Sequence, residues 1–213
     1  MPSICLYLLV ASIGLLAGWP IIGFWSTSPN PTDPSKLLAQ PMVQLNDGDI
    51  IFRRGKSAVS EAVLSIDPNP IFSHVGIVVF DGTNPMVVHA VPAETEGERN
   101  AVKVEPVNRF IALDRASAIA VYRLRESNDH PSISHAAALE ALRLARANTP
   151  FDTAYDLDTP DKLYCTELVW RAFRKAGMDL APDPPRKRFL LWSGRYIPPS
   201  LLQASPLVER VCC

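Results

Sequence analysis

An excess of charge of one sign is missing from this chain, since 21 lysines and arginines stand against 22 aspartates and glutamates. Such a near-neutral protein has no general attraction for nucleic acid, so a nucleic-acid-binding function is not expected. Long polar tracts are also missing, and 47% of the residues are hydrophobic, which excludes a disordered chain. The length of 213 residues suits one globular domain with an additional segment.

Cysteine is scarce. Cys5 lies in an apolar leader, Cys212 and Cys213 are the last two residues, and Cys165 is the only cysteine in the body of the chain. This distribution excludes a disulfide framework, and no C-x-x-C spacing indicates structural zinc. Adjacent cysteines pair with each other only under strain, so the final two are interpreted as free. A single body cysteine is most often a small buried hydrophobe, and a role for Cys165 must come from its surroundings.

The motifs of several other enzyme classes are absent as well. The sequence has no G-x-S-x-G elbow, no Gly-rich phosphate loop and no dinucleotide fingerprint. A zinc site would need carboxylates beside the histidines, and the sequence does not place any there. We therefore expect neither a metal nor another cofactor.

One long apolar run is present, and it lies at the start of the sequence. Residues 4–25 contain no charge, and about 20 such residues can cross a bilayer as a helix. Tryptophans 19 and 25 suit a membrane interface, whereas a cleaved signal would normally show a basic start and a small-x-small cleavage site. The sequence thus predicts a membrane anchor or signal segment over 1–25, a Pro/Ser/Thr-rich linker over 26–36 and a catalytic domain over 37–213. Both versions of the leader export that domain, either attached to the membrane or secreted.

We predict that the leader is retained, because the run is long and carries no cleavage signal. Intact-mass measurement of protein extracted from membranes should detect the N-terminal residues. A mature form that starts near Ser26 would contradict this prediction.

In the body, β-type segments come first and helical segments follow. Short runs rich in Val and Ile, bounded by Gly, Pro, Asn or Asp, predict strands at 48–54, 74–80, 86–91, 101–107 and 118–124. Apolar periodicity predicts helices at 57–66, 132–147 and 162–176, and residues 181–200 read as irregular coil. This order predicts an α+β domain with a small antiparallel sheet packed against helices.

Two histidines lie on the second and third predicted strands. With Asp81-Gly82 as a two-residue hairpin loop, His74 would lie directly opposite His89 on one face of the sheet. A four-residue loop over 81–84 also keeps both on one face, whereas a three-residue loop would separate them. Two imidazoles on one face can bind a metal, or they can serve as the base of a thiol enzyme and the group that orients it.

Cys165 lies early in the last predicted helix. If this helix begins near Pro160, the cysteine falls in the second turn, and a break after Lys162 would bring it into the first turn. Unpaired amides at a helix N-terminus stabilise a thiolate and lower its pKa. The alternative is a buried packing thiol beside Leu168 and Val169.

Four segments together resemble a known family: GDIIFRRG (48–55), FSHVGIVV (72–79), VVHA (87–90) and YCTELVWRAF (164–173). In this order they are similar to the permuted papain-like cysteine amidases of the NlpC superfamily, the YiiX/YebB-like branch, in which the histidine strand precedes the cysteine helix. The resemblance covers roughly residues 46–178. It implies Cys165 as nucleophile, His74 as general base and His89 as the group that orients the base, a position where relatives often carry glutamate. It also implies that Tyr164 shapes the site and that Asp49, part of the family pattern, caps or forms a turn.

The expected function is a thiol-dependent amidase or peptidase that works through an acyl-enzyme, with a peptide or amide substrate such as a cell-wall peptide. One alternative is a lipid acyl hydrolase or acyltransferase of the lecithin:retinol acyltransferase type, which a membrane anchor would suit. Another is a catalytically silent binding module that keeps the fold.

Overall fold

The computed structural model describes residues 44–93, 97–125, 131–189 and 192–213. The predicted anchor over 1–25 and the linker over 26–36 lie outside the described residues and stay predictions. Within the described ranges, no helix combines the length and apolar character that crossing a membrane requires.

A six-stranded antiparallel sheet forms the centre of the fold, and its strand order is β4-β3-β2-β1-β5-β8. The strands are β1 (Ile50–Gly55), β2 (His74–Asp81), β3 (Asn84–Val91), β4 (Ala101–Pro106), β5 (Ala116–Leu124) and β8 (Val208–Cys212). The first five confirm the strands expected from the Val- and Ile-rich runs. The predicted α+β class is confirmed too.

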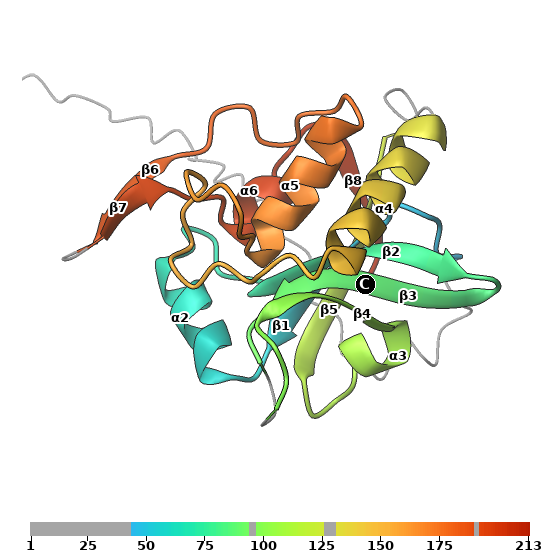
Figure 1. Ribbon diagram of the computed structural model, residues 1–213, viewed down its shortest axis with the longest axis horizontal. Helices are drawn as coiled ribbons and strands as arrows, with labels where there is room; N and C mark the ends of the chain where they lie inside the picture. Colours follow the sequence, from blue (N-terminus) through green and yellow to red (C-terminus); the bar gives the residue numbers. More distant parts are fainter. Residues whose placement is uncertain (1–43, 94–96, 126–130, 190–191) are drawn as a thin grey trace, which may run out of the picture. The chain divides into compact units, whose positions relative to one another are not determined.

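The helices lie on both faces of this sheet and at one end of it (Figure 1). Helices α4 (Pro131–Arg146) and α5 (Cys165–Lys175) cover one face, and the short α3 (Val107–Phe110) lies on the other. Helix α2 (Ala58–Ile66) follows β1, and Ser57 caps it by accepting a hydrogen bond from the Ser60 amide. A short α6 (Pro199–Gln203) precedes β8.

Alternation along the strands builds a separate apolar layer on each face of the sheet. On the α4/α5 face, Phe52, Val75 and Ile77 pack with helix residues such as Leu168 and Val169 in one buried cluster. On the α3 face a smaller cluster forms, and its buried members are Ile51, Val78, Val87, Val107, Phe110, Ile111, Ala116, Ile119, Val121 and Cys212. The smaller layer leaves room on that face for polar side chains near the start of β2.

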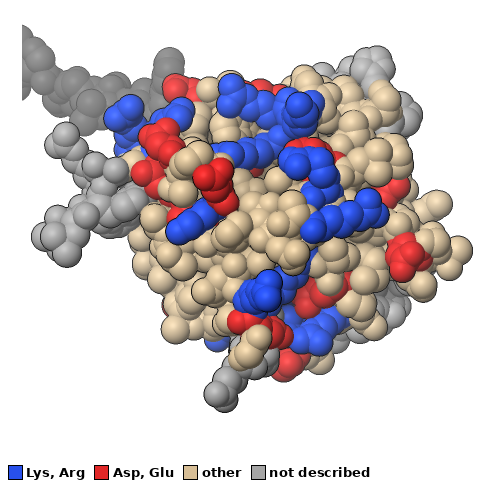
Figure 2. All heavy atoms as spheres, in the orientation of Figure 1, with Lys and Arg blue, Asp and Glu red and all other residues tan. Residues whose placement is uncertain are grey.

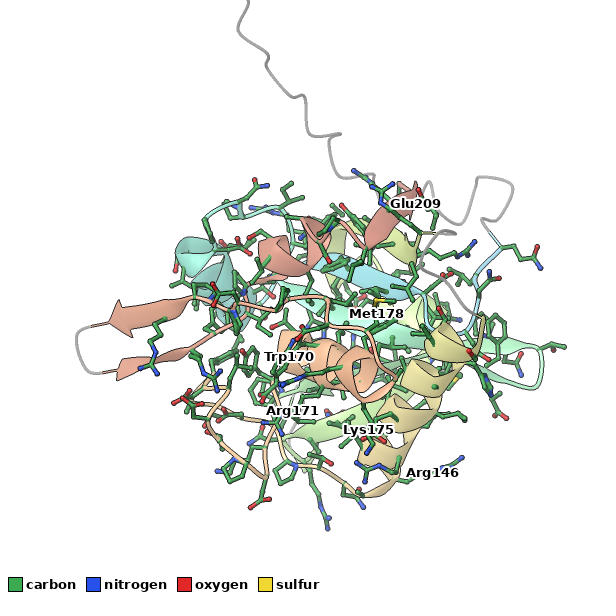
Figure 3. The ribbon with its side chains drawn as sticks, turned by 90° about the horizontal axis from the view of Figure 1, so that it is seen from above. Arg146, Trp170, Arg171, Lys175, Met178 and Glu209 are labelled. Carbon is green, nitrogen blue, oxygen red and sulfur yellow. A yellow bond between two sulfur atoms is a disulfide. The ribbon has the colours of Figure 1, made fainter. Side chains whose placement is uncertain are left out.

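The outer surface of the helix layer is polar. Figure 2 shows lysine and arginine side chains gathered over α4 and α5 with acidic side chains among them, and Figure 3 shows Arg171 and Lys175 of α5 beside Arg146 of α4. Arg171 pairs with Glu167 at 2.7 Å, one helical turn away. The Glu167 side chain is fully buried, so Arg171 pairs from the helix surface with a carboxylate beneath it.

Two boundaries differ from the sequence-based expectations. The prediction of irregular coil over 181–200 was wrong, because β6 (Arg186–Phe189) and β7 (Trp192–Arg195) pair as a separate antiparallel hairpin and α6 begins at Pro199. Helix α5 begins at Cys165 rather than near Lys162, because Leu163 forms a parallel bridge with Phe151 and its amide donates to Pro150 O. Residues before Cys165 are therefore extended and cannot join the helix.

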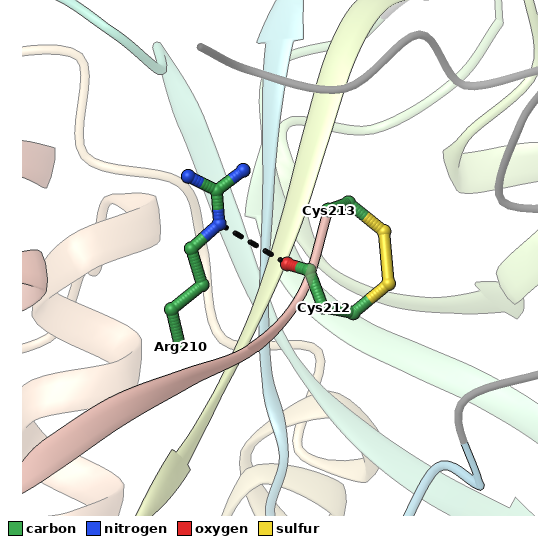
Figure 4. Close-up of a disulfide and its surroundings, with 3 residues drawn as sticks. All are labelled: Arg210, Cys212 and Cys213. Atoms are coloured by element: carbon green, nitrogen blue, oxygen red, sulfur yellow. Dashed lines mark hydrogen bonds between the residues drawn. A yellow bond between two sulfur atoms is a disulfide. The ribbon is translucent and has the colours of Figure 1, made fainter. Parts of the chain in front are cut away.

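The terminal cysteines correct another expectation. Cys212 and Cys213 are bonded to each other, and Arg210 donates a hydrogen bond to the Cys212 carbonyl (Figure 4). Cys213 has a positive φ of 67°, and in this backbone conformation the adjacent sulfur atoms meet. Cys212 is buried in the smaller apolar cluster, so the pair lies on β8 and away from the pocket that holds Cys165.

Candidate active site

A pocket of about 430 Å³ lies between β1, β2, α2 and the segment that leads into α5. Cys165 and His74 both line it, although Cys165 belongs to the helix on one face of the sheet and His74 points to the other face. Its remaining lining residues are Arg53, Gly55, Lys56, Ser57, Val59, Ser60, Val63, Ser73, Val91, Pro92, Ala93, Asp114, Arg115, Phe151 and Tyr155. The pocket therefore combines a buried thiol, an imidazole, cationic groups and an apolar wall.

Cys165 is the first residue of α5, so the first-turn alternative is the one observed. The residue before it, Tyr164, is the N-cap and forms no side-chain cap hydrogen bond. The first amides of the helix are thus left for another acceptor, and the amides of Thr166, Val75 and Cys165 itself lie where they can hydrogen-bond the sulfur. A nucleophile in this position is surrounded by donors from two elements.

Hydrogen bonds on both sides of Cys165 hold it in place. The Tyr164 hydroxyl accepts a hydrogen bond from the Ile197 amide at 2.9 Å, and the Thr166 hydroxyl donates to the Ile197 carbonyl at 2.6 Å. Tyr164 is fully buried and its ring stacks on Tyr196 with centroids 5.4 Å apart. Tyr164 therefore supports the site from behind, by tying the start of α5 to the segment before α6, and it does not line the pocket.

Burial decides the protonation state of the thiol. It raises the pKa of Cys165 to about 11, although the amides of Thr166, Val75 and Cys165 and the charge of Arg53 act in the opposite direction. The amides at the helix N-terminus act in the expected direction, but the cost of desolvating the thiolate is larger, so the net pKa of Cys165 is raised. At neutral pH the sulfur carries its proton and needs a base.

The two histidines are in contact, as the hairpin argument required, but in a different register. The loop places Phe80 opposite Pro85, so His89 faces Gly76 and His74 lies diagonally from it. The register is the one expected for a loop over 81–84, but Asp81 also pairs with Asn84, so the loop is Gly82-Thr83 and the expected loop at Asp81-Gly82 was wrong. His74 Nε2 nevertheless lies 2.8 Å from His89 Nδ1.

Gly76 makes this diagonal contact possible. A Cβ atom at Gly76 would lie 2.4 Å from Val87 Cγ1, 2.8 Å from the Val88 carbonyl oxygen and 3.1 Å from the Cβ of His89. Only glycine leaves the space between the two strands that the imidazole on β3 needs.

Glu105, which the sequence did not reveal as a site residue, extends the pair of histidines onto a third strand. Glu105 lies on β4, two residues from the partner of His89, and its Oε1 lies 3.1 Å from His89 Nε2. Its Oε2 lies 3.3 Å from Arg109 Nε and 3.2 Å from an Arg115 nitrogen. Burial raises the pKa of Glu105, but the contact with His89 and the charges of Arg115 and Arg53 outweigh burial, so the pKa falls below its usual value.

Because Glu105 is a carboxylate, it fixes the protons of both imidazoles. A carboxylate only accepts hydrogen bonds, so in the neutral state of the histidine pair His89 keeps its proton on Nε2, toward Glu105, and accepts from His74 through Nδ1. His74 must therefore carry its proton on Nε2. Its Nδ1 keeps a free electron pair, which is what a general base needs.

The environment of His74 keeps it uncharged. Burial lowers the pKa of His74 well below its usual value, and the charges of Arg53 and Arg115 lower it further, as does His89 when it is protonated. Phe110 of α3 stacks on the His74 ring with centroids 5.6 Å apart and meets the His89 ring edge-on at 5.3 Å. Arg53 lies opposite His74 on β1 and donates to the Phe110 carbonyl at 2.9 Å, which fixes α3 against the two rings.

Tyr155 is a second pocket residue that the sequence did not reveal. It lies in the segment before α5 and has a positive φ of 53°, unusual for a residue with a side chain. Burial raises the pKa of its hydroxyl, and the proximity of Cys165 and Asp152 raises it further. The hydroxyl is thus a neutral donor beside the sulfur.

Asp49 lies apart from this group. Its carboxylate accepts from the Asn46 amide at 2.8 Å and pairs with Arg123 of β5 at 2.7 Å, and it does not line the pocket. The turn-forming role expected for Asp49 agrees with these contacts. Of the five residues named from the sequence, His74 and His89 are in contact, Cys165 lines the same pocket as His74, Tyr164 lies directly before Cys165, and Asp49 lies elsewhere.

Comparisons with known proteins identify the family of the chain. Residues 44–186 match the model of the permuted papain-like amidase family of YaeF/YiiX type, peptidase family C92. The chain belongs to this family of cysteine hydrolases. It is 27% identical over 151 residues to the uncharacterized protein YiiX of Escherichia coli K12, covering 70% of this chain and 68% of that one. The crystal structure of YiiX from Escherichia coli O157:H7, described as a metalloprotein, shares the fold with a TM-score of 0.63 and 22% identity, over 79% of this chain and 97% of that one.

The raised pKa of Cys165 predicts how the thiol responds to pH. Alkylation by iodoacetamide, followed by mass spectrometry of the peptide that contains Cys165, should be slow at neutral pH and should accelerate as pH rises toward 11, since only the thiolate reacts. A rate that is already at its maximum between pH 6 and 9 would show a resting thiolate and contradict the prediction.

Proposed function

We propose that the chain is a thiol amidase in which Cys165 attacks the carbonyl carbon of an amide and His74 moves the proton. The observation that carries this proposal is the row of His74, His89 and Glu105 across three neighbouring strands, together with a pocket that both His74 and Cys165 line. The membership of the chain in an amidase family supports an amide substrate.

In the first step the Cys165 sulfur bonds to the carbonyl carbon while His74 Nδ1 accepts the thiol proton. The carbonyl oxygen becomes an oxyanion and receives hydrogen bonds from the Cys165 amide and the Tyr155 hydroxyl. The His74 imidazolium then gives its proton to the leaving nitrogen, the carbon–nitrogen bond breaks, and the amine departs. A thioester remains on Cys165.

In the second step water attacks the thioester carbonyl while His74 again accepts a proton. The carbon–sulfur bond breaks, the sulfur recovers the proton from His74, and the carboxylic acid departs. His89 and Glu105 do not touch the substrate in this scheme. They orient His74 and stabilise its charged form, because His89 contacts the imidazolium and the negative charge of Glu105 lies behind His89.

The residues of the site do not fit a metal ion, even though the similar YiiX structure is described as a metalloprotein. His74 Nε2 and His89 Nδ1 face each other at 2.8 Å, and the other nitrogen of His89 faces Glu105, which leaves no space for a cation between them. Across the part of the chain that the structure describes, no three His, Cys, Asp or Glu residues are grouped as metal ligands. The steps above are therefore derived without a metal.

We predict that Cys165→Ser abolishes amide hydrolysis while the protein remains folded. Serine is nearly the same size, but its hydroxyl is far less acidic than the thiol, so His74 cannot generate the nucleophile. Steady-state hydrolysis of acyl 4-nitroanilides measures the loss, and thermal unfolding measures the fold. Wild-type turnover by the variant would refute the role of Cys165.

We predict that Glu105→Gln lowers kcat by about tenfold or more and moves the acidic limb of the pH–kcat/KM profile to lower pH. Removing the carboxylate destabilises the His74 imidazolium, so the pKa of His74 falls and the base stays unprotonated at lower pH. The matched control is Glu98→Gln, the same change in a carboxylate that pairs with Lys103 at 2.6 Å. If both variants keep the wild-type profile, Glu105 is a structural partner of the arginines only.

A further inference from the structure

We infer that the protein has a binding groove for the acyl chain of its substrate, which extends from Cys165 along α2 to Tyr196. The inference rests on the proposed amidase function and adds a substrate class to it: amides whose acyl part is a long aliphatic chain. It is carried by a second hollow that adjoins the catalytic pocket, by an apolar stripe on α2, and by the lack of partners for a peptide backbone along that helix.

The second hollow has a volume of about 250 Å³ and shares Val63 and Tyr155 with the catalytic pocket. Its other lining residues are Ala62, Ser65, Ile66, Ala154 and Tyr196. Tyr155 thus lies with one side toward the nucleophile and the other toward this hollow. The two cavities therefore adjoin each other at Val63 and Tyr155, which line both.

One face of α2 lines both cavities with apolar side chains. Val59 and Val63 line the catalytic pocket, and Ala62, Val63 and Ile66 line the hollow, a spacing of three, four and seven residues that places them along one side of a helix. Val59 is 43% exposed, although valine is usually buried, and it lies in the same pocket as the thiol. An amphipathic helix normally turns such a stripe to the core, and here the stripe faces the two cavities.

The opposite wall is aromatic and comes from the segment that precedes α5 and from the segment before α6. Phe151 and Tyr155 contact each other edge to face with centroids 5.6 Å apart, and Tyr155 meets Tyr196 in the same way at 6.3 Å. These rings continue the apolar lining from the pocket to the far end of the hollow. Charged groups line only the catalytic pocket, and the polar residues of the hollow are uncharged: Ser65, Tyr155 and Tyr196.

An acyl chain fits this groove better than a peptide does. A peptide bound in an extended form needs backbone donors and acceptors beside it, and enzymes usually supply them from a strand edge. The groove wall here is a helix, whose amides and carbonyls are paired within α2, so a peptide backbone would lose its hydrogen bonds to water without replacement. An aliphatic chain has no such groups and gains from leaving water.

The test uses the wild-type protein and a series of N-acyl 4-nitroanilides from acetyl to decanoyl. Each methylene buried in the groove should raise kcat/KM by up to about fourfold, from about 0.8 kcal/mol per methylene, until the chain reaches the end of the hollow. Ala62→Phe and, independently, Ala154→Phe fill the hollow from its two walls. Each should reduce the decanoyl-to-acetyl ratio of kcat/KM at least tenfold.

Ala58→Phe is the matched control, because it makes the same change on α2 at an exposed residue that lines neither cavity. It should leave the ratio as in the wild type, and thermal unfolding of all three variants checks that they are folded. Equal kcat/KM for acetyl and decanoyl substrates, or a ratio that Ala62→Phe and Ala154→Phe do not reduce, overturns the groove. So does a peptide anilide that outperforms every acyl chain and loses as much as the decanoyl substrate in the two filling variants.

A binding measurement separates the groove from the catalytic proposal. Decanoic acid titrated calorimetrically into Cys165→Ser should bind, and it should bind at least tenfold more weakly when Ala62→Phe is added. Binding without turnover by the wild type would leave the groove in place and refute the amidase function. Turnover of the acetyl substrate without decanoate binding would do the reverse.

Discussion

The contact between His74 Nε2 and His89 Nδ1 requires a register between β2 and β3 that keeps both side chains on the same face of the sheet. Side chains alternate across a sheet, so a shift of one residue between β2 and β3 would send one of the rings to the α4/α5 face. The same alternation places Glu105 of β4 on the face that the histidines share. The apolar residues in these strands oppose a slip of one residue, because it would move Val75 and Ile77 out of the main cluster. Packing of the core thereby determines the geometry of the proton relay.

The nucleophile depends on a second constraint, the point at which α5 begins. The bridge between Phe151 and Leu163 keeps the chain extended up to Tyr164, and Ile197 is held by hydrogen bonds from the residues on both sides of Cys165. These contacts come from segments distant in the sequence. These contacts determine where α5 begins and override the helix-start pattern at Thr159-Pro160. For this reason the start predicted from the sequence is several residues too early.

Much of the fold could be predicted because its signals are local and periodic. The five Val- and Ile-rich strands and the helices around α2, α4 and α5 all follow from patterns within a few residues. The hairpin between β6 and β7 could not be predicted, because its arginine-rich sequence lacks alternation and prolines lie on both sides of it. The histidine pair followed from the hairpin length, even though the register was wrong by two residues, since a shift of two leaves the face unchanged.

Glu105 shows what kind of residue a single sequence does not reveal. It lies in a predicted strand beside Lys103, and nothing in that strand distinguishes a carboxylate that faces a buried histidine from one that faces solvent. Its role becomes visible only when β4 is paired with β3 and when Arg109 and Arg115 are found around the same carboxylate. Contact with His89 and the charges of Arg115 and Arg53 lower the pKa of Glu105, so it stays ionised although it is partly buried. An isolated carboxyl in the same place would take up a proton.

The same burial governs both reacting groups and links the site to its apolar walls. Desolvation raises the pKa of Cys165 and lowers that of His74, so the resting pair is neutral and no charge is separated until a carbonyl is present. Charge then appears on the oxyanion and on His74 together, where the first amides of α5 and the carboxylate of Glu105 already point. In a pocket from which an apolar substrate excludes water, these fixed dipoles and charges act at low dielectric and stabilise the charged state more than they would in water. The apolar wall on α2 lies beside a neutral thiol and a neutral imidazole. An apolar substrate that covers this wall would exclude the remaining water and so complete the low-dielectric environment of the reaction.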